Sequence, residues 1–291
     1  MDRKNFLKKS ILTGITAALV PGALNAANEK KKALKVLEEQ IGFNHLPNKE
    51  IKTMKTVLHK ANSRGHANHG WLESYHTFSF ANYYNPERMH FGALRVFNDD
   101  YVQPKMGFGT HPHNNMEIIS IPLVGALSHK DSMGNKKAIT TGEVQAMSAG
   151  SGLTHSEFND SSDERVNFFQ LWIIPNEENV VPRYEQKHFK EDERKDQLQV
   201  LVSSVNSENS ESLKIHQDAQ ISRITLTKGN TFDYITKSEN HGVYIMNVEG
   251  SISIDEQQLE NRDALGIWET SKVTLKAKET SDILLVEVPM K

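Results

Sequence analysis

The sequence predicts an all-β protein made of two β-barrels, and three observations lead to this fold class. Short runs of β-branched and aromatic residues recur along the chain, separated by Gly, Asn, Asp and Ser residues. Across residues 90–175 no long apolar helix pattern competes with these runs, which is typical of a sandwich or a barrel. A weak hairpin echo between residues 124–144 and 249–265 indicates two copies of one barrel, with two unrelated hairpins as the alternative.

The first predicted element is an export signal at residues 1–26. Four basic residues precede an apolar, charge-free stretch of 17 residues, and small residues at its end suit a signal peptidase. One proline and two glycines interrupt this stretch, which is marginal in length for a permanent membrane span. We therefore expect the segment to be removed, leaving a mature chain with no stable membrane span.

The export route is suggested by residues 3–8, Arg-Lys-Asn-Phe-Leu-Lys. They resemble the twin-arginine export motif with lysine in place of the second arginine. This route would place the protein in the periplasm or elsewhere outside the cytoplasm. An ordinary secretory signal and an uncleaved membrane anchor are the alternatives. Residues 27–51 follow as a linker or tether, in which residues 29–41 have the apolar spacing of a short amphipathic helix.

Two β-rich regions follow the tether and are predicted to be the two domains. The first, residues 52–186, contains strand-like runs such as Met116–Ile121 and Val166–Ile174. A polar, charged passage at residues 187–197 then marks the boundary, so the second domain is assigned to residues 187–291.

The composition excludes several classes of chemistry. The chain of 291 residues has 34 basic and 37 acidic side chains, so no broad positive field favours nucleic acid as a partner. The absence of cysteine excludes disulfides, thiolate metal sites and cysteine nucleophiles. No glycine-rich nucleotide fingerprint precedes a helix, so a flavin or nicotinamide is not expected. The 13 histidines and the carboxylates are the groups left for metal or redox chemistry.

Two pairs of potential metal ligands occur in the first domain. His111 and His113 are two residues apart, and so are His155 and Glu157. In an extended strand, alternate side chains leave the same face about 6 to 7 Å apart at Cα, so each pair can converge on one ion. Pro112 removes a ladder hydrogen bond and suits a strand start or a bulge. Two such strands facing each other would supply three nitrogens and one oxygen.

This ligand set predicts a divalent transition metal without choosing its identity. Three neutral imidazoles and a carboxylate suit Fe(II), Mn, Co, Ni, Cu or Zn. Four protein ligands on an ion that accepts six would leave two positions open for substrate, water or O₂. A closed tetrahedral zinc site would have the same appearance in the sequence.

Three segments of the first domain carry a family resemblance. Residues 107–119 and 142–159 look like the two metal-binding motifs of the pirin family, within the cupin superfamily, and residues 64–80 are similar to the family's N-terminal segment. The similarity extends over residues 55–290, and the nearest members are bacterial pirin-like bicupins described as quercetin 2,3-dioxygenases. The resemblance implies two consecutive cupin (jelly-roll) β-barrels, a bicupin, with a metal in the first.

The resemblance also implies one metal ion per chain, usually iron, and therefore Fe(II) here. Its ligands would be His111, His113, His155 and Glu157. General cupins take their carboxylate from the first motif, where this chain has Glu117, so Glu117 is the alternative ligand. Following the family, we assign Glu157 to the ion and Glu117 to a supporting or outward-facing position.

The second domain lacks comparable ligands. Where the hairpin echo would place a second pair, the chain has Leu275 flanked by Val273 and Ala277, whose side chains cannot bind a metal. From residue 199 onward the histidines are His216 and His241. We therefore expect this cupin domain to be structural or to bind a partner.

The function implied by the resemblance is a dioxygenase that opens the central ring of a flavonol such as quercetin with O₂ and releases carbon monoxide. A metal acting as a Lewis acid would lower the pKa of the flavonol 3-hydroxyl, and Glu157 is the candidate base for its proton. The expected partners are O₂ and a small aromatic or phenolic substrate, and a monomer is expected. The alternative is an iron-binding protein that senses redox state or binds a partner without turnover. The predicted export argues against a chromosomal partner.

A few apolar residues of the first domain have two interpretations. They could shape a pocket for aromatic rings, although we expect most of them to be ordinary barrel core. The residues are Phe78, Phe80, Phe97, Met147 and Phe158.

Overall fold

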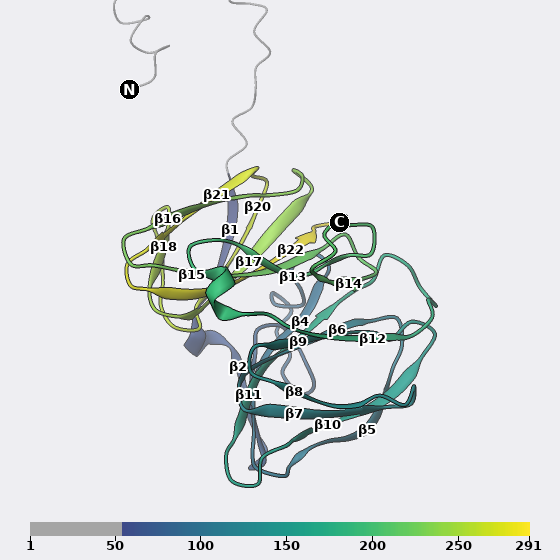
Figure 1. Cartoon of the computed structure of the whole chain (residues 1–291). Helices are drawn as coiled ribbons and strands as arrows, with labels where there is room; N and C mark the ends of the chain where they lie inside the picture. Colours follow the sequence, from purple (N-terminus) through teal and green to yellow (C-terminus); the bar gives the residue numbers. More distant parts are fainter. Residues whose placement is uncertain (1–53) are drawn as a thin grey trace, which may run out of the picture. The chain divides into compact units, whose positions relative to one another are not determined.

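The computed structural model describes residues Met54–Lys291. They form two barrels, each with a seven-stranded and a four-stranded sheet (Figure 1). Within this part of the chain only two short 3-10 turns, η2 (Ala61–Ser63) and η3 (Glu191–Arg194), interrupt the strands. The predicted all-β bicupin architecture is therefore confirmed. The predicted export signal at residues 1–26 and the tether at residues 27–51 lie outside the described residues.

The N-terminal barrel is antiparallel throughout. In sheet order, its larger sheet contains β12 (Arg183–His188), β9 (Glu143–Ser148), β6 (Glu117–Val124), β11 (Val166–Ile173), β4 (Leu94–Val102), β3 (Leu72–His76) and β2 (Gly65–Asn68). Its smaller sheet contains β5 (Gly107–His113), β10 (Leu153–Asn159), β7 (Ala126–Asp131) and β8 (Lys136–Thr140). The candidate metal ligands predicted from the sequence lie on β5 and β10, which are neighbours in the smaller sheet.

The C-terminal barrel repeats this arrangement. Its larger sheet contains, in order, β1 (Lys55–His59), β20 (Ala264–Trp268), β17 (His241–Glu249), β22 (Ser281–Pro289), β15 (Gln220–Leu226), β13 (Gln199–Ser204) and β14 (Leu213–Ile215). Its smaller sheet contains β16 (Thr231–Ile235), β21 (Lys272–Ala277), β18 (Ile252–Ile254) and β19 (Gln257–Leu259). The β13–β14 pair is parallel, and the other strand pairs of this barrel are antiparallel.

The first described strand, β1, belongs to the second barrel. This placement differs from the predicted division into domains at residues 52–186 and 187–291. β1 pairs with β20 at the edge of the C-terminal sheet. Its Leu58 packs against the interior of that barrel, and its His59 is hydrogen-bonded to the Tyr244 hydroxyl at 2.8 Å. β12 in turn continues the N-terminal sheet to residue 188. The sequence could not show which sheet β1 and β12 join, because an alternating pattern identifies a strand but not its partner.

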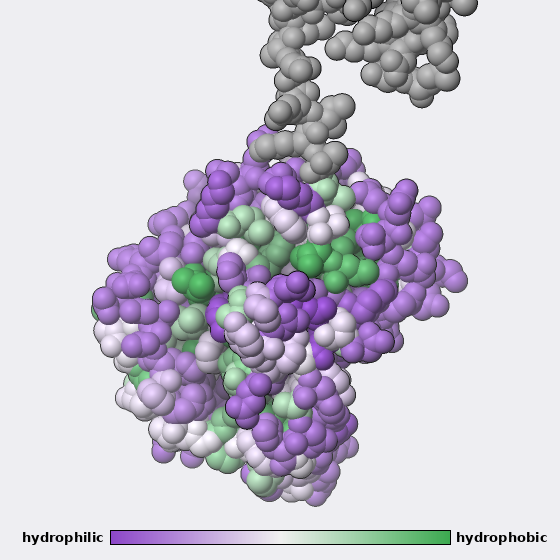
Figure 2. Space-filling view, turned by 180° about the vertical axis from the view of Figure 1, so that it is seen from behind, coloured by the Kyte–Doolittle hydropathy of each residue, from purple (hydrophilic) through white to green (hydrophobic). Residues whose placement is uncertain are grey.

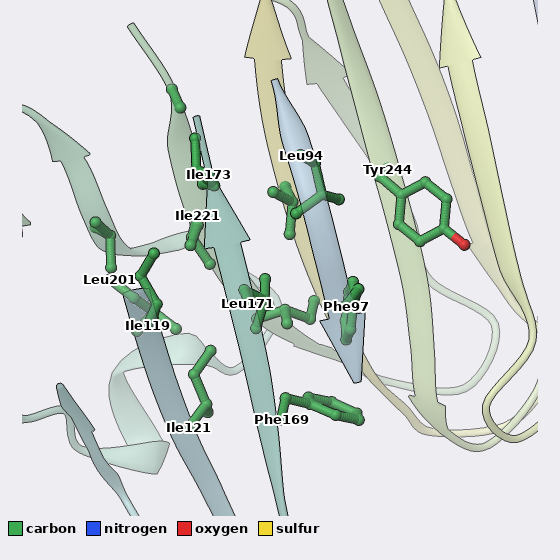
Figure 3. Packing of buried hydrophobic residues seen from close by; sticks show 14 of the residues in the cluster. Leu94, Phe97, Ile119, Ile121, Phe169, Leu171, Ile173, Leu201, Ile221 and Tyr244 are labelled. Carbon is green, nitrogen blue, oxygen red and sulfur yellow. The ribbon is translucent and has the colours of Figure 1, made fainter. Parts of the chain in front are cut away.

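One continuous apolar core joins the two larger sheets. Phe97, Ile119 and Phe169 contribute to it from the N-terminal sheet, and Tyr244 and Ile221 contribute from the C-terminal sheet (Figure 3). All five side chains are fully buried. Because successive residues of a strand face opposite sides, the residues between them on β4, β6 and β11 face the interior of the N-terminal barrel.

The two barrel interiors differ in polarity. The C-terminal interior contains one large apolar cluster that includes Ile245, Leu275 and Leu285, together with a few buried polar side chains such as Glu287, to which the Tyr234 hydroxyl donates. The N-terminal interior has two smaller apolar clusters, one around Phe168 and one around Ile118. A row of buried polar side chains lies in register across its larger sheet. The row consists of Gln145, Ser120, Gln170, Asn98 and His76. The interior of the first barrel therefore contains a row of hydrogen-bonding side chains of the kind found in functional sites.

The surface seen in Figure 2 is largely hydrophilic, with apolar patches between the polar side chains. Two of the five pocket candidates named from the sequence, Phe78 and Phe97, belong to the core between the barrels, as expected for ordinary core. Phe158 is exposed. Among the described residues no helix is long and apolar enough to cross a membrane.

Candidate metal centre

Three imidazoles converge on the smaller sheet of the N-terminal barrel. His111 on β5 lies directly opposite His155 on β10, and His113 follows two residues later on the same face of β5. The ring centroid of His155 lies 4.4 Å from that of His111 and 4.8 Å from that of His113. One potential ligand atom from each ring lies within 4.8 Å of the others. The structure thus brings together the three histidines that the sequence singled out.

The surroundings of these rings favour neutral imidazoles with free lone pairs. The Nδ1–H of His111 donates to the carbonyl of Gly109 at 2.8 Å, which leaves Nε2 available as a ligand. Burial and the neighbouring imidazoles lower the pKa of His113 to about 4 and that of His155 to about 2. Both ring nitrogens of His155 are buried and lack a hydrogen-bond partner. Buried unpaired nitrogens are costly, so these residues fit a transition metal well.

Glu157 lies in the same cluster but on its inner side. A β-bulge between β5 and β10 places Glu157 opposite Phe108, one residue out of regular register with the histidines of β5. On its other side Glu157 lies opposite His129 of β7. The carboxylate accordingly groups with His155 and His129, within 4.8 Å, and not with His111 and His113. The four predicted ligands and His129 therefore form two overlapping groups that share His155.

The Glu157 carboxylate is held by two hydrogen bonds from the polar row. The Ser120 hydroxyl donates to Oε1 at 3.1 Å, and the Gln170 amide donates to Oε2 at 2.9 Å. Burial raises the pKa of Glu157 to about 7, although both hydrogen bonds act to lower it. A ligand carboxylate oriented by such partners is typical of protein metal sites.

Glu117, the alternative carboxylate, points away from this cluster. It shares its strand face with Ile119 and Ile121, which belong to the core between the barrels. The Ser148 hydroxyl donates to its Oε2 at 2.6 Å. Burial raises the pKa of Glu117 to about 7, against the opposing effect of hydrogen bonds from Ser148 and the backbone of His216. Within the described part of the chain, Glu117 belongs to neither group of candidate ligands.

Sequence reasoning missed His129 and the polar row. His129 has no neighbouring histidine in the chain, so no short motif marks it. The row did leave a signal, because Ser120, Gln145 and Gln170 each lie between apolar residues in the middle of a strand. An isolated polar residue at the centre of a buried strand indicates an internal polar site.

A cleft open to solvent reaches His113. It has a volume of about 500 Å³ and is lined by residues of β5, β10 and the adjoining turns, including His113 and Leu153. Beside it, the Trp172 ring meets His113 edge to face with centroids 5.0 Å apart, and Phe80 packs on the far side of Trp172 at 5.3 Å. A small molecule can therefore reach His113 through this cleft.

The two glutamates are expected to respond differently to substitution by Gln. Glu157→Gln removes an anionic oxygen from the ligand cluster, so the bound metal should fall to well under half of the wild-type content. Glu117→Gln, the matched control, should retain full metal content because Glu117 faces the other barrel. Elemental analysis after dialysis against a weak chelator measures both. Loss of metal in Glu117→Gln with retention in Glu157→Gln would reverse our assignment.

Glu117→Gln should also remove a pH-dependent loss of stability. The folded-state pKa of about 7 lies above the ordinary value of 4.5, so the stability contributed by Glu117 is fully present below that ordinary value and is lost as the pH rises through about 7. We expect the variant to be more stable than the wild type by about 1 to 3 kcal/mol at pH 8 and by much less at pH 5. Urea unfolding of metal-free protein measures this, with the exposed Glu178→Gln as control. If the stability difference between Glu117→Gln and the wild type is the same at pH 5 and at pH 8, the raised pKa is contradicted.

Comparisons with known proteins agree with this geometry. A family model described as Pirin matches residues 57–173, and one described as the quercetinase C-terminal cupin domain matches residues 200–288. The chain is 46% identical over 232 residues to a quercetin 2,3-dioxygenase of Escherichia coli strain K12, which covers 80% of this chain and 98% of that protein. It is 39% identical over 223 residues to a pirin-like protein of Caulobacter vibrioides, with 77% and 95% covered.

Solved structures give the same result. The bacterial pirin YhhW from Escherichia coli in complex with nickel(II) is similar with a TM-score of 0.76 at 44% identity, covering 81% of this chain and 99% of that one. A quercetin 2,3-dioxygenase from Acinetobacter baumannii, at 22% identity and a TM-score of 0.67, covers 82% of this chain and 88% of that one, and supports the fold alone. The family resemblance found in the sequence is confirmed, and the chain belongs to the pirin family.

Proposed function

We propose that this protein is a metal-dependent dioxygenase that opens a flavonol-type, quercetin-like substrate with O₂. The observation that carries the proposal is the convergence of three imidazoles beside the buried carboxylate of Glu157. The 46% identical relative named quercetin 2,3-dioxygenase supports the substrate class. An adjoining cleft of about 500 Å³ is in the size range of small-molecule sites.

The ion is proposed to be Fe(II), with Mn, Co, Ni, Cu and Zn as chemically suitable substitutes. Histidine nitrogens with one carboxylate suit all of these ions, and the similar YhhW structure contains nickel(II). His111, His113, His155 and Glu157 would hold it. When bound, a divalent ion supplies Lewis acidity that lowers the pKa of a flavonol hydroxyl.

The protein side chains bind and orient the substrate and move its proton. The cleft beside His113 is the proposed position of a planar ring system, and the Trp172 ring packs against the His113 ring. The Glu157 carboxylate is the proposed acceptor of the 3-hydroxyl proton. Ser120 and Gln170 hold its two oxygens in place, so this acceptor needs no reorientation during the reaction. The buried position of Glu157 keeps bulk water from competing for that proton.

Turnover is tested by incubating iron-loaded protein with a panel of flavonols. We expect O₂ uptake with release of carbon monoxide, and a loss of at least about a hundredfold in kcat/KM in His155→Ala, which removes the ligand shared by both groups. His241→Ala in the C-terminal barrel is the matched control and should keep its activity. If no flavonol is consumed while the iron stays bound, the alternative of an iron-binding redox sensor or interaction protein without turnover is favoured.

The predicted export is part of the proposal, and it concerns residues outside the described structure. We propose that the mature protein acts outside the cytoplasm after removal of residues 1–26. Mass spectrometry of the protein from a periplasmic fraction should then give a chain that begins close to residue 27. A chain that retains Met1 and stays in the cytoplasmic fraction would contradict both export and cleavage.

A further inference from the structure

A second set of potential ligands lies beside the three imidazoles. His129, His155 and Glu157 are all buried, and one potential ligand atom from each lies within 4.8 Å of the others. We propose that these residues form a second, inner position for the metal ion. The outer position is the group of His111, His113 and His155. Because both groups share His155, they are alternative positions for one ion and keep the expected content at one ion per chain.

Strand register builds the inner position. β10 lies between β5 and β7 in the smaller sheet. On the β7 side, His155 is opposite Asp131 and Glu157 is opposite His129 in regular pairing. On the β5 side, the bulge shifts Glu157 out of register with His111. Cross-strand neighbours in regular pairing have the closest side chains, so Glu157 is nearer to His129 than to the histidines of β5.

His129 has the hydrogen-bond arrangement of a metal-binding histidine. Its Nε2–H donates to Oδ2 of Asp131 at 3.1 Å, and its Nδ1 is buried without a partner. The backbone N–H groups of Met133 and Asn135 donate to Oδ1 of Asp131, and the Asn135 amide donates to Oδ2. Histidines that bind metals commonly donate their other ring N–H to a carboxylate in this way. The free Nδ1 of His129 is therefore available as a ligand.

The remaining two ligands are also prepared for an ion. Both ring nitrogens of His155 lack a hydrogen-bond partner, and its ring centroid lies 5.3 Å from that of His129 and 4.4 Å from that of His111. His155 can therefore serve either position. Glu157 presents a carboxylate whose oxygens are held by Ser120 and Gln170.

The two positions differ in chemistry and in access. The inner position combines two imidazoles with one carboxylate, a set typical of non-haem Fe(II) sites, and all three of its residues are buried. The outer position uses His111 and His113 in place of His129, beside Glu157 as its proposed fourth ligand, and both of these histidines are half-buried. An ion at the outer position therefore exchanges with solvent through the cleft, whereas an ion at the inner position is shielded from it.

Removing the outer position tests the inner one directly. The variant His111→Ala/His113→Ala retains His129, His155 and Glu157. We expect it to bind one equivalent of Co(II) in an anaerobic titration followed by Co(II) absorption. Adding His129→Asn should then weaken this binding by at least about tenfold, since a ligand is lost. Adding the exposed His66→Ala instead, as the matched control, should leave it unchanged. No Co(II) binding by a folded double variant, or binding that His129→Asn leaves unchanged, would overturn the proposal.

A second measurement does not depend on the double variant folding. His129→Asn alone keeps the outer position and removes the His129 imidazole from the inner one. Co(II) should then pass to a competing chelator at least about tenfold faster than from the wild type, because the shielded position is lost. An unchanged rate would overturn the proposal. Neither measurement requires turnover, so failure of the flavonol assay leaves this inference standing, and failure of these titrations leaves the dioxygenase proposal standing.

Discussion

The position of β10 between β5 and β7 is the constraint on which the candidate centre depends. It places His155 opposite His111 on one side and opposite Asp131 on the other. A slip of one residue would turn every side chain of β10 to the other face of the sheet, so the register decides whether the imidazoles meet. The bulge beside His155 then separates Glu157 from the histidines of β5 and brings it to His129. One strand thus supplies the residue common to both groups of ligands.

The two barrels share an architecture but differ in what they bury. One large apolar cluster occupies the C-terminal barrel, where Asn247 has one buried oxygen without a partner, whereas the N-terminal barrel contains several such polar atoms on His129, Gln145 and His155. Each such atom costs about 1 to 3 kcal/mol unless a ligand, an ion or water satisfies it. The apolar core between the larger sheets includes residues of both barrels and offsets this cost. The C-terminal barrel therefore has a physical role in supporting a polar site that it does not itself contain.

The candidate metal centre has one side that is open to solvent and one side that is buried. His113 lies at the cleft, where a planar substrate can approach, while Glu157 lies behind it among Ser120 and Gln170. An open side suits substrate and O₂, and a closed side suits retention of the ion and control of a proton.

The sequence by itself determined the all-β class, the two-barrel organisation and the two strands that carry the candidate ligands, because alternation and ligand type are local properties of the chain. It left Glu157 and Glu117 as alternatives, and it contained no motif for His129. Only the tertiary structure decided that Glu117 faces the other barrel, that β1 joins the C-terminal sheet and that His129 lies opposite Glu157. These facts depend on strand pairing, bulges and sheet packing between residues far apart in the chain, and an alternating pattern carries no information about such partners.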